Sequence, residues 1–291
     1  MLRYLALLMF AFVAVPASAQ SAFTSDRISV EVRGEGPDVV LIPGLSSHPQ
    51  VWESTIQALP GYRYHLVHVA GFAGKAPEAN ASGPVLVPVA EEIARYISEA
   101  GLERPAIVGH SMGGSWALLV AGRNPGLVSR VMVVDMLPFI GAMFGGPNAT
   151  AESLRPIAEQ IRAGMASATP EARRAQIEQM MAGMIRTEAL RPRAIEQSLS
   201  SHPPTSAQGF HDLVVTDLRP EVARLGVPLT VLYTDPAGAP LTPAQIDQFY
   251  QASYAGAPQA VLRRIPDTAH FIMFDAAEAF QRELREFLTR N

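Results

Sequence analysis

The stretch Pro105-Ala106-Ile107-Val108-Gly109-His110-Ser111-Met112-Gly113-Gly114 decides how this chain folds. Its first four residues form a short apolar run, which is typical of a strand buried inside a sheet. A helix is predicted from about Gly113 to Arg123, because Asn124-Pro125-Gly126 then closes it. Between strand and helix, the pattern Gly-x-Ser-x-Gly predicts a tight turn that presents the Ser111 hydroxyl above the sheet.

Ser111 is therefore the candidate nucleophile. Such a turn strains the serine backbone, and Gly109 and Gly113 remove the side chains that would otherwise collide there. The helix that follows points its first N–H groups and the positive end of its dipole at any negative charge that forms. The motif favours an activated serine over a chance loop of the same composition.

Strands and helices alternate on both sides of this turn. Residues 27–32 alternate in polarity, residues 34–37 turn, and residues 39–42 are apolar, which predicts a hairpin leading into a buried strand. Further strands are predicted at residues 62–69, 128–134, 228–234 and 260–265, with helices ending near Gly101 and running through Phe280 and Leu288. This order predicts an α/β fold, with a mostly parallel central sheet and helices on both faces.

The alternation stops between about residues 137 and 213, where the chain becomes helical and rich in Ala, Met, Arg and Gln. We expect a helical cap here, inserted into one domain that spans residues 20–291. Its apolar residues have two interpretations, either packing the cap onto the body or forming an adaptable apolar wall for a substrate. They include Phe139, Ile140, Met143, Phe144, Met180, Met181 and Met184.

Composition narrows the class of partner. The chain has 291 residues, of which 48% are hydrophobic, so it is long enough for one large domain with a sizeable core. A formal net charge of −4, without a cluster of Lys and Arg, offers no basic surface for nucleic-acid phosphates. We expect a small-molecule substrate and no nucleic acid.

The first 19 residues have the pattern of a secretory signal peptide. Arg3 precedes an apolar run over residues 4–15, and Ala17-Ser18-Ala19 supplies a small-x-small cleavage site. An uncleaved anchor is the alternative, but the run is shorter than the roughly 20 residues that span a bilayer. We therefore predict cleavage after Ala19, no stable membrane insertion afterwards, and a periplasmic or secreted protein.

Residues 39–44, 109–114 and 266–271 together resemble the α/β-hydrolase superfamily, in its capped, serine esterase- and lipase-like form. This resemblance implies that His270, in the loop before the last helix, is the general base. It also implies an oxyanion hole built from the backbone N–H groups of Leu45 and Met112. The early motif departs from the usual His-Gly, since Pro43 precedes Gly44, but a backbone donor survives that change.

The acid partner of His270 has two main candidates. Asp235 follows the predicted strand 228–234, where most members of the superfamily carry the acid, although it comes early after that strand. Asp135 follows strand 128–134, the position that a minority use. Asp217, or no acid at all, is the remaining alternative. Both main candidates keep the chain order Ser, Asp, His.

No metal or cofactor is implied by the sequence. It contains no H-E-x-x-H pattern, no P-loop, and no G-x-G-x-x-G after a strand. His65, His68 and His110 are predicted to have structural roles. The residues thus predict an α/β-fold serine hydrolase that cleaves a small, apolar carboxylic ester through a Ser-His-Asp acyl-enzyme mechanism. The alternatives are a non-catalytic protein that binds an apolar ligand, or a hydrolase of amide, lactone or carbon–carbon bonds.

Overall fold

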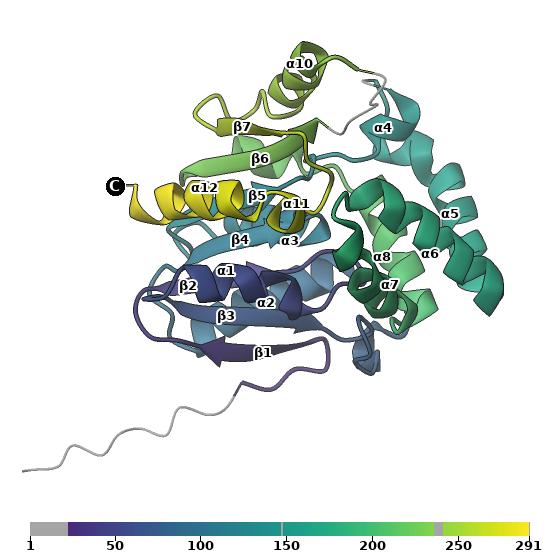
Figure 1. The fold of residues 1–291 in the computed structure, drawn as a ribbon, viewed down its shortest axis with the longest axis horizontal. Coiled ribbons are helices and arrows are strands. Elements are labelled where there is room, and N and C mark those ends of the chain that lie inside the picture. Colours follow the sequence, from purple (N-terminus) through teal and green to yellow (C-terminus); the bar gives the residue numbers. More distant parts are fainter. Residues whose placement is uncertain (1–22, 147, 236–240, 291) are drawn as a thin grey trace, which may run out of the picture.

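A computed structural model describes residues 23–146, 148–235 and 241–290, and their strands form one seven-stranded sheet (Figure 1). The order across the sheet is β1-β3-β2-β4-β5-β6-β7; β1 runs antiparallel to β3 and the other pairs are parallel. This confirms the predicted α/β fold. The predicted signal peptide, residues 1–19, lies outside the described residues. The strands are β1 Ile28–Arg33, β2 Asp38–Ile42, β3 Arg63–Val69, β4 Ala106–His110, β5 Arg130–Val134, β6 Leu229–Asp235 and β7 Val261–Pro266.

The predicted hairpin at the start of the sheet is wrong. β1 pairs with β3, with Ile28 opposite Val69, whereas β2 lies between β3 and β4. The apolar run of β2 explains this placement, because a strand with two buried faces is covered best inside a parallel sheet. The alternating β1, in which Val32 is 50% exposed, suits the edge.

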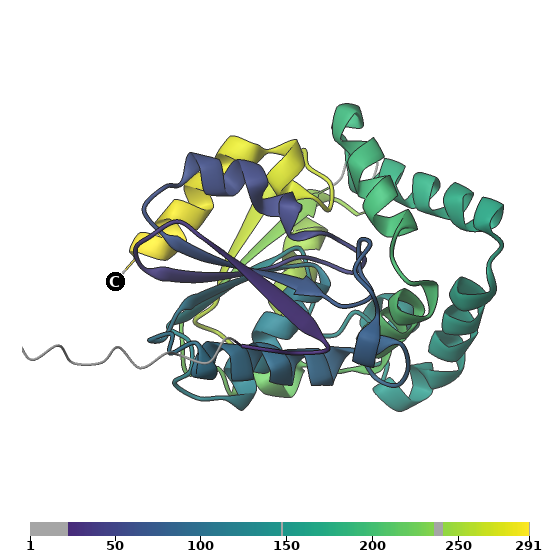
Figure 2. The ribbon, with the colours of Figure 1, turned by 90° about the horizontal axis from the view of Figure 1, so that it is seen from below.

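Helices cover both faces of the sheet. Figure 2 shows α1 and α12 on one face and α2 and α3 on the other. The body helices are α1 Glu53–Ala58, α2 Leu86–Glu99, α3 Met112–Arg123, α9 Arg219–Ala223, α10 Pro243–Ser253, α11 Ile272–Asp275 and α12 Ala277–Thr289. Between β5 and α9 come α4 Ala142–Gly145, α5 Ala151–Ser167, α6 Pro170–Met184, α7 Arg191–Leu199 and α8 Pro203–Val215, and short 3-10 turns are η1 Pro49–Trp52, η2 Glu78–Asn80 and η3 Glu188–Leu190.

The period-2 pattern of the strands divides the core between the two faces. Val40 packs in the cluster that contains Trp116 of α3, whereas its neighbour Leu41 packs in the cluster that contains Trp52 and Phe280. All five side chains are essentially inaccessible to solvent. The sheet is therefore a rigid platform, and its loops carry whatever chemistry the protein performs.

Helices α4–α8 lie beyond the edge at which β4 and β5 end (Figure 1). Hydrogen bonds join them to the body at several points. The Asp212 carboxylate of α8 accepts hydrogen bonds from the backbone N–H groups of Val85 and Leu86, at the start of α2. The N–H of Phe271 donates to the carbonyl of Met184 at the end of α6. In the part of the chain that the structure describes, no helix is long and apolar enough to cross a membrane.

Candidate active site

Ser111 occupies the tight turn between β4 and α3. Its φ of 54° and ψ of −126° place a non-glycine residue in a sparsely populated region. The Ser111 N–H donates to the carbonyl of Val134, 2.9 Å away, and the Ser111 carbonyl accepts from Gly114 N–H at 2.7 Å. The surrounding backbone thus holds the strained serine in place, as is common where a side chain must be presented for chemistry.

Neighbouring backbone atoms leave no room for a side chain at the two glycines of the motif. A Cβ atom at Gly109 would lie 2.0 Å from the carbonyl oxygen of Gly113. One at Gly113 would lie 2.3 Å from the carbonyl oxygen of Ile42. These neighbours are backbone atoms that cannot swing aside, so the close packing of β2, β4 and α3 depends on both glycines.

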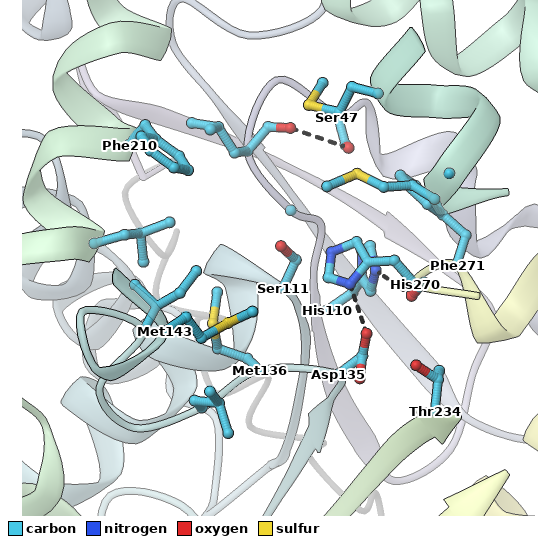
Figure 3. Close-up of a pocket in the computed structure, with 18 of the residues that line it drawn as sticks. Ser47, His110, Ser111, Asp135, Met136, Met143, Phe210, Thr234, His270 and Phe271 are labelled. Atoms are coloured by element: carbon cyan, nitrogen blue, oxygen red, sulfur yellow. Dashed lines mark hydrogen bonds and ion pairs between the residues drawn. The ribbon is translucent and has the colours of Figure 1, made fainter. Parts of the chain in front are cut away.

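His270 lies in the loop between β7 and α11. Its Nδ1 is 2.7 Å from Oδ2 of Asp135, and Figure 3 shows the ring between the side chains of Asp135 and Ser111. Because Nδ1 is engaged by the carboxylate, Nε2 is the nitrogen that remains for the serine. The Ser111 hydroxyl makes no hydrogen bond to any described residue, which leaves its proton free for transfer once a substrate brings the groups together.

The structure brings Asp135, and not Asp235, to the imidazole of His270. Asp135 stands at the end of β5, whereas Asp235 is the last residue of β6. The Asp235 carboxylate accepts instead from the Arg264 guanidinium on β7 and from the N–H of Asp267, at 2.9 Å. The leading sequence prediction therefore disagrees with the geometry, because a cation on the neighbouring strand turns Asp235 away from the site.

Asp217, the remaining acid candidate, is also engaged elsewhere. Its carboxylate accepts from the guanidinium and the N–H of Arg219 at the start of α9. Burial alone would raise the pKa of Asp217, but the hydrogen bonds and the charge of Arg219 outweigh it and lower that pKa. The Asp217 carboxylate therefore bonds to the start of α9 and not to the imidazole of His270.

The two predicted oxyanion donors lie on either side of Ser111. A Cβ atom at Gly44 would be 3.0 Å from Ser111 Cβ, so the loop carrying Leu45 passes directly against the serine. Met112 is the first residue of α3, where N–H groups have no partner within the helix. Neither amide donates to another residue in the described ranges. Both are therefore available to a negatively charged oxygen.

The serines of this loop have structural partners. The hydroxyl groups of Ser46 and Ser206 are 2.7 Å apart, which links the loop to α8. Ser47 donates to the carbonyl of Leu45 at 3.4 Å. Both hydroxyl groups are thus engaged, one with α8 and the other within the loop.

A cavity of about 520 Å³ opens above Ser111, which is a size that suits a small-molecule ligand. Its floor carries Ser111, Asp135 and His270, and no Lys or Arg of the described residues lines it. Most of the wall is apolar and belongs to the helices above the sheet and to α10. The wall includes Met136, Leu137, Ile140, Met143, Met180, Met181, Met184, Phe210, Leu213, Leu241, Ile246, Phe249 and Phe271.

The apolar residues of the cap fall into two groups, one packed inside the cap and one lining the cavity. Phe139 is buried in a small cluster with Leu154 and Val214, where α5 packs on α8. Met143 and Met180 line the cavity yet are 66% and 43% exposed, so they stand at its mouth. The first group stabilises the cap, whereas the second forms a flexible apolar part of the cavity wall.

The other histidines of the sheet have structural partners. His65 lies between the Tyr96 hydroxyl at 2.6 Å and the Asp38 carboxylate at 2.8 Å. His68 bonds to the carbonyl of Phe72, and burial lowers its pKa to about 4. Both rings therefore stabilise β3, His65 through its two side-chain partners and His68 as a neutral ring.

Two further side chains, His110 of the nucleophile motif and Tyr250 of α10, contact the catalytic candidates. His110 is buried and donates from Nε2 to the carbonyl of His270 at 3.0 Å, and burial lowers its pKa well below the usual range. The hydroxyl of Tyr250 donates to Oδ1 of Asp135 at 3.0 Å. His110 precedes Ser111 in the sequence, whereas Tyr250 reaches Asp135 only in the folded chain and no motif marks it. Within the residues that the structure describes, no three His, Cys, Asp or Glu side chains form a metal-binding group.

Known proteins resemble this chain over most of its length. Residues 37–277 match a family described as the alpha/beta hydrolase fold. The chain is 29% identical over 263 residues to a pimeloyl-[acyl-carrier protein] methyl ester esterase of Vibrio cholerae, covering 89% of this chain and 97% of that protein. A protein of the same description from Vibrio vulnificus is 26% identical over 258 residues, covering 88% of this chain and 96% of the relative.

Solved structures share the fold at lower identity. An esterase from Exiguobacterium antarcticum superposes with a TM-score of 0.72 at 21% identity, over 90% of this chain and 95% of the other. An enol-lactonase from Burkholderia xenovorans gives 0.71 at 19% identity, over 90% and 96%. Such distant likeness establishes the architecture alone, so any statement about the reaction depends on the site itself.

Proposed function

The chain belongs to the α/β-hydrolase fold family, and we propose that it is an esterase that uses Ser111, His270 and Asp135 as a catalytic triad. The observation that carries the proposal is the 2.7 Å contact between His270 Nδ1 and Asp135 Oδ2, beside a serine held in the strained turn. That contact fixes the imidazole tautomer that accepts a proton at Nε2.

The proposed reaction follows from this arrangement. The Ser111 oxygen attacks the ester carbonyl carbon while His270 Nε2 takes the hydroxyl proton. The carbonyl oxygen becomes negative and accepts from the N–H groups of Leu45 and Met112, each contributing roughly 3 kcal/mol of transition-state stabilisation. His270 then protonates the leaving alcohol, which leaves an acyl group on Ser111. In the second half of the reaction a water molecule attacks this acyl group while His270 takes its proton, and His270 returns a proton to the Ser111 oxygen as the acid leaves.

The cavity supports an apolar acyl group as the part of the substrate that is recognised. Its wall of methionine, leucine, isoleucine and phenylalanine offers contact area, while Asp135 and His270 are already paired with each other. The relatives from Vibrio are named for the methyl ester of pimeloyl-[acyl-carrier protein], which is also a carboxylic ester with a small alcohol part. We therefore propose a neutral carboxylic ester with an apolar acyl chain as the substrate class.

A fluorophosphonate probe tests the proposed nucleophile. The wild-type protein should be labelled covalently, and Ser111→Ala, checked for folding by circular dichroism, should not be labelled. Absence of labelling on folded wild-type protein would exclude an activated serine and favour a non-catalytic, ligand-binding protein.

The mass of the mature chain purified from cells tests the further proposal that residues 1–19 are removed on export.

Chain length should control the rate through the apolar wall. For p-nitrophenyl esters of straight acyl chains, kcat/KM should rise about fourfold with each added methylene, because burying one CH₂ contributes about 0.8 kcal/mol. The rise should stop once the chain reaches the mouth at Met143 and Met180. A flat profile from acetate to decanoate would refute the apolar acyl site while leaving the esterase activity itself established.

A further inference from the structure

The Asp135 carboxylate has a second donor besides His270. Its Oδ2 faces His270 Nδ1 at 2.7 Å, and its Oδ1 accepts from the hydroxyl of Tyr250 at 3.0 Å. We propose that Tyr250 is a positioning residue that holds the plane and the charge of the Asp135 carboxylate, and through it orients His270. This inference rests on the proposed esterase function.

The position of Tyr250 is fixed by the elements around it. Its ring stacks on that of Tyr233 in β6, with centroids 4.1 Å apart and planes at 17°. The Tyr233 hydroxyl donates to Oδ1 of Asp247 at 2.8 Å, which ties α10 to the strand one turn before Tyr250. Arg264 on β7 donates to the same oxygen at 2.9 Å. The phenol that reaches Asp135 is therefore attached to two strands and a helix.

A second donor matters because of where Asp135 stands. Its backbone has a φ of 52°, beyond the end of β5, so its own main chain is in a sparsely populated conformation. A carboxylate held at one oxygen alone can turn about its last bond, and the imidazole that it orients would turn with it. Tyr250 removes that freedom and also satisfies the second oxygen in the partly buried site.

The groups around the pair keep a constant charge in the working range, so a pH profile reports the pair itself. Burial raises the pKa of Tyr250 and Tyr254 well above the usual value, so both stay protonated and Tyr250 remains a donor. Burial also raises the pKa of Tyr233 to about 12. His110, which faces the His270 ring, is kept neutral by burial.

Replacement Tyr250→Phe removes the donor and keeps the stacked ring. We expect kcat for a short ester to fall about tenfold, because a hydrogen bond to a charged group is lost at the catalytic pair. KM should stay within about twofold, because phenylalanine keeps the ring with which Tyr250 lines the cavity. The less satisfied carboxylate should hold the imidazolium proton more firmly. The acid limb of the kcat/KM profile should therefore move to higher pH, by about half a unit to one unit.

Tyr233→Phe is the matched control, because it also removes one phenol hydroxyl from the same ring stack but has no bond to Asp135. The stacked ring and the bond from Arg264 to Asp247 still hold Tyr250 in that variant. It should leave the acid limb unchanged. A double-mutant cycle separates positioning from general damage, since Tyr250→Phe should cost nothing more once Asp135→Asn has removed the charge that it holds.

A shape-conserving replacement keeps the test valid if Tyr250→Phe does not fold. A difluorotyrosine introduced at position 250 is a more acidic phenol and a stronger donor, so it should move the acid limb to lower pH. An unmoved acid limb in either folded variant, or a full loss of activity that persists in the Asp135→Asn background, overturns the positioning role. A wild-type protein without esterase activity would overturn the proposed function instead.

Discussion

Ser111→Ala and His270→Ala should each lower kcat for ester hydrolysis by about 10⁶-fold, and the double variant should be no worse than either single variant. The reason is that the serine is a weak nucleophile without a base, and the base has no proton to take without the serine. The geometry supports this mutual dependence of serine and histidine, because His270 lies between Ser111 and Asp135 (Figure 3). Residual activity should come from the backbone donors at Leu45 and Met112 and from the apolar cavity.

The measurement is single-turnover and steady-state hydrolysis of one p-nitrophenyl ester by all three variants. Ser167→Ala is a suitable control, since its hydroxyl donates only to the carbonyl of Ala163 on the exposed surface of α5, and it should keep the wild-type rate. Losses that multiply in the double variant would show that Ser111 and His270 act independently, which contradicts an acyl-enzyme formed by the pair.

The nucleophile turn could be predicted from sequence because its determinants are local. Gly109 and Gly113 are needed by contacts within a few residues and with the adjacent β2, and any chain that makes this turn must leave those positions free of side chains. His270 was predicted from the resemblance of residues 266–271 to the superfamily, and the structure places it in the loop between β7 and α11. The places of β1 and β2 in the sheet could not be predicted in this way, because both strands pair with β3, which comes later in the chain.

The acid could not be chosen from sequence for a physical reason. Adjacent strands β5 and β6 end at the same edge of the sheet, so Asp135 and Asp235 both reach the region of the site. The difference lies in long-range partners, with Arg264 on β7 engaging Asp235 and Tyr250 on α10 engaging Asp135. Neither partner forms a recognisable spacing with the aspartate that it binds.

The helical segment of residues 137–213 could also be predicted only in part from the sequence. Its composition predicted helices and apolar contact, and helices α4–α8 are present. The facing of individual side chains depends on how those helices pack: Met180 and Met181 are neighbours in sequence and both line the cavity, although one is 43% exposed and the other 4%. Only the contacts of α6 with the body decide which residue forms the mouth and which the wall.

Asp135→Asn should lower kcat about 10⁴-fold while leaving KM nearly unchanged. An amide in place of the carboxylate favours the wrong imidazole tautomer and cannot stabilise the imidazolium that forms when Ser111 attacks. Asp235→Asn is the matched comparison, since it makes the same chemical change at the end of the neighbouring strand. It should keep kcat within a few fold, because Asp235 bonds to Arg264 and Asp267 and not to His270.

Thermal unfolding of both variants separates catalysis from stability. Asp235→Asn weakens a partly exposed ion pair, so its free energy of unfolding should fall by about 1 kcal/mol or less. Asp135→Asn should also remain folded, since Tyr250 can still donate to the amide oxygen. A 10⁴-fold loss in folded Asp235→Asn with little change in Asp135→Asn would reverse the assignment of the acid. It would mean that the loop carrying His270 turns towards β6 during the reaction, away from the partner that holds it in this structure.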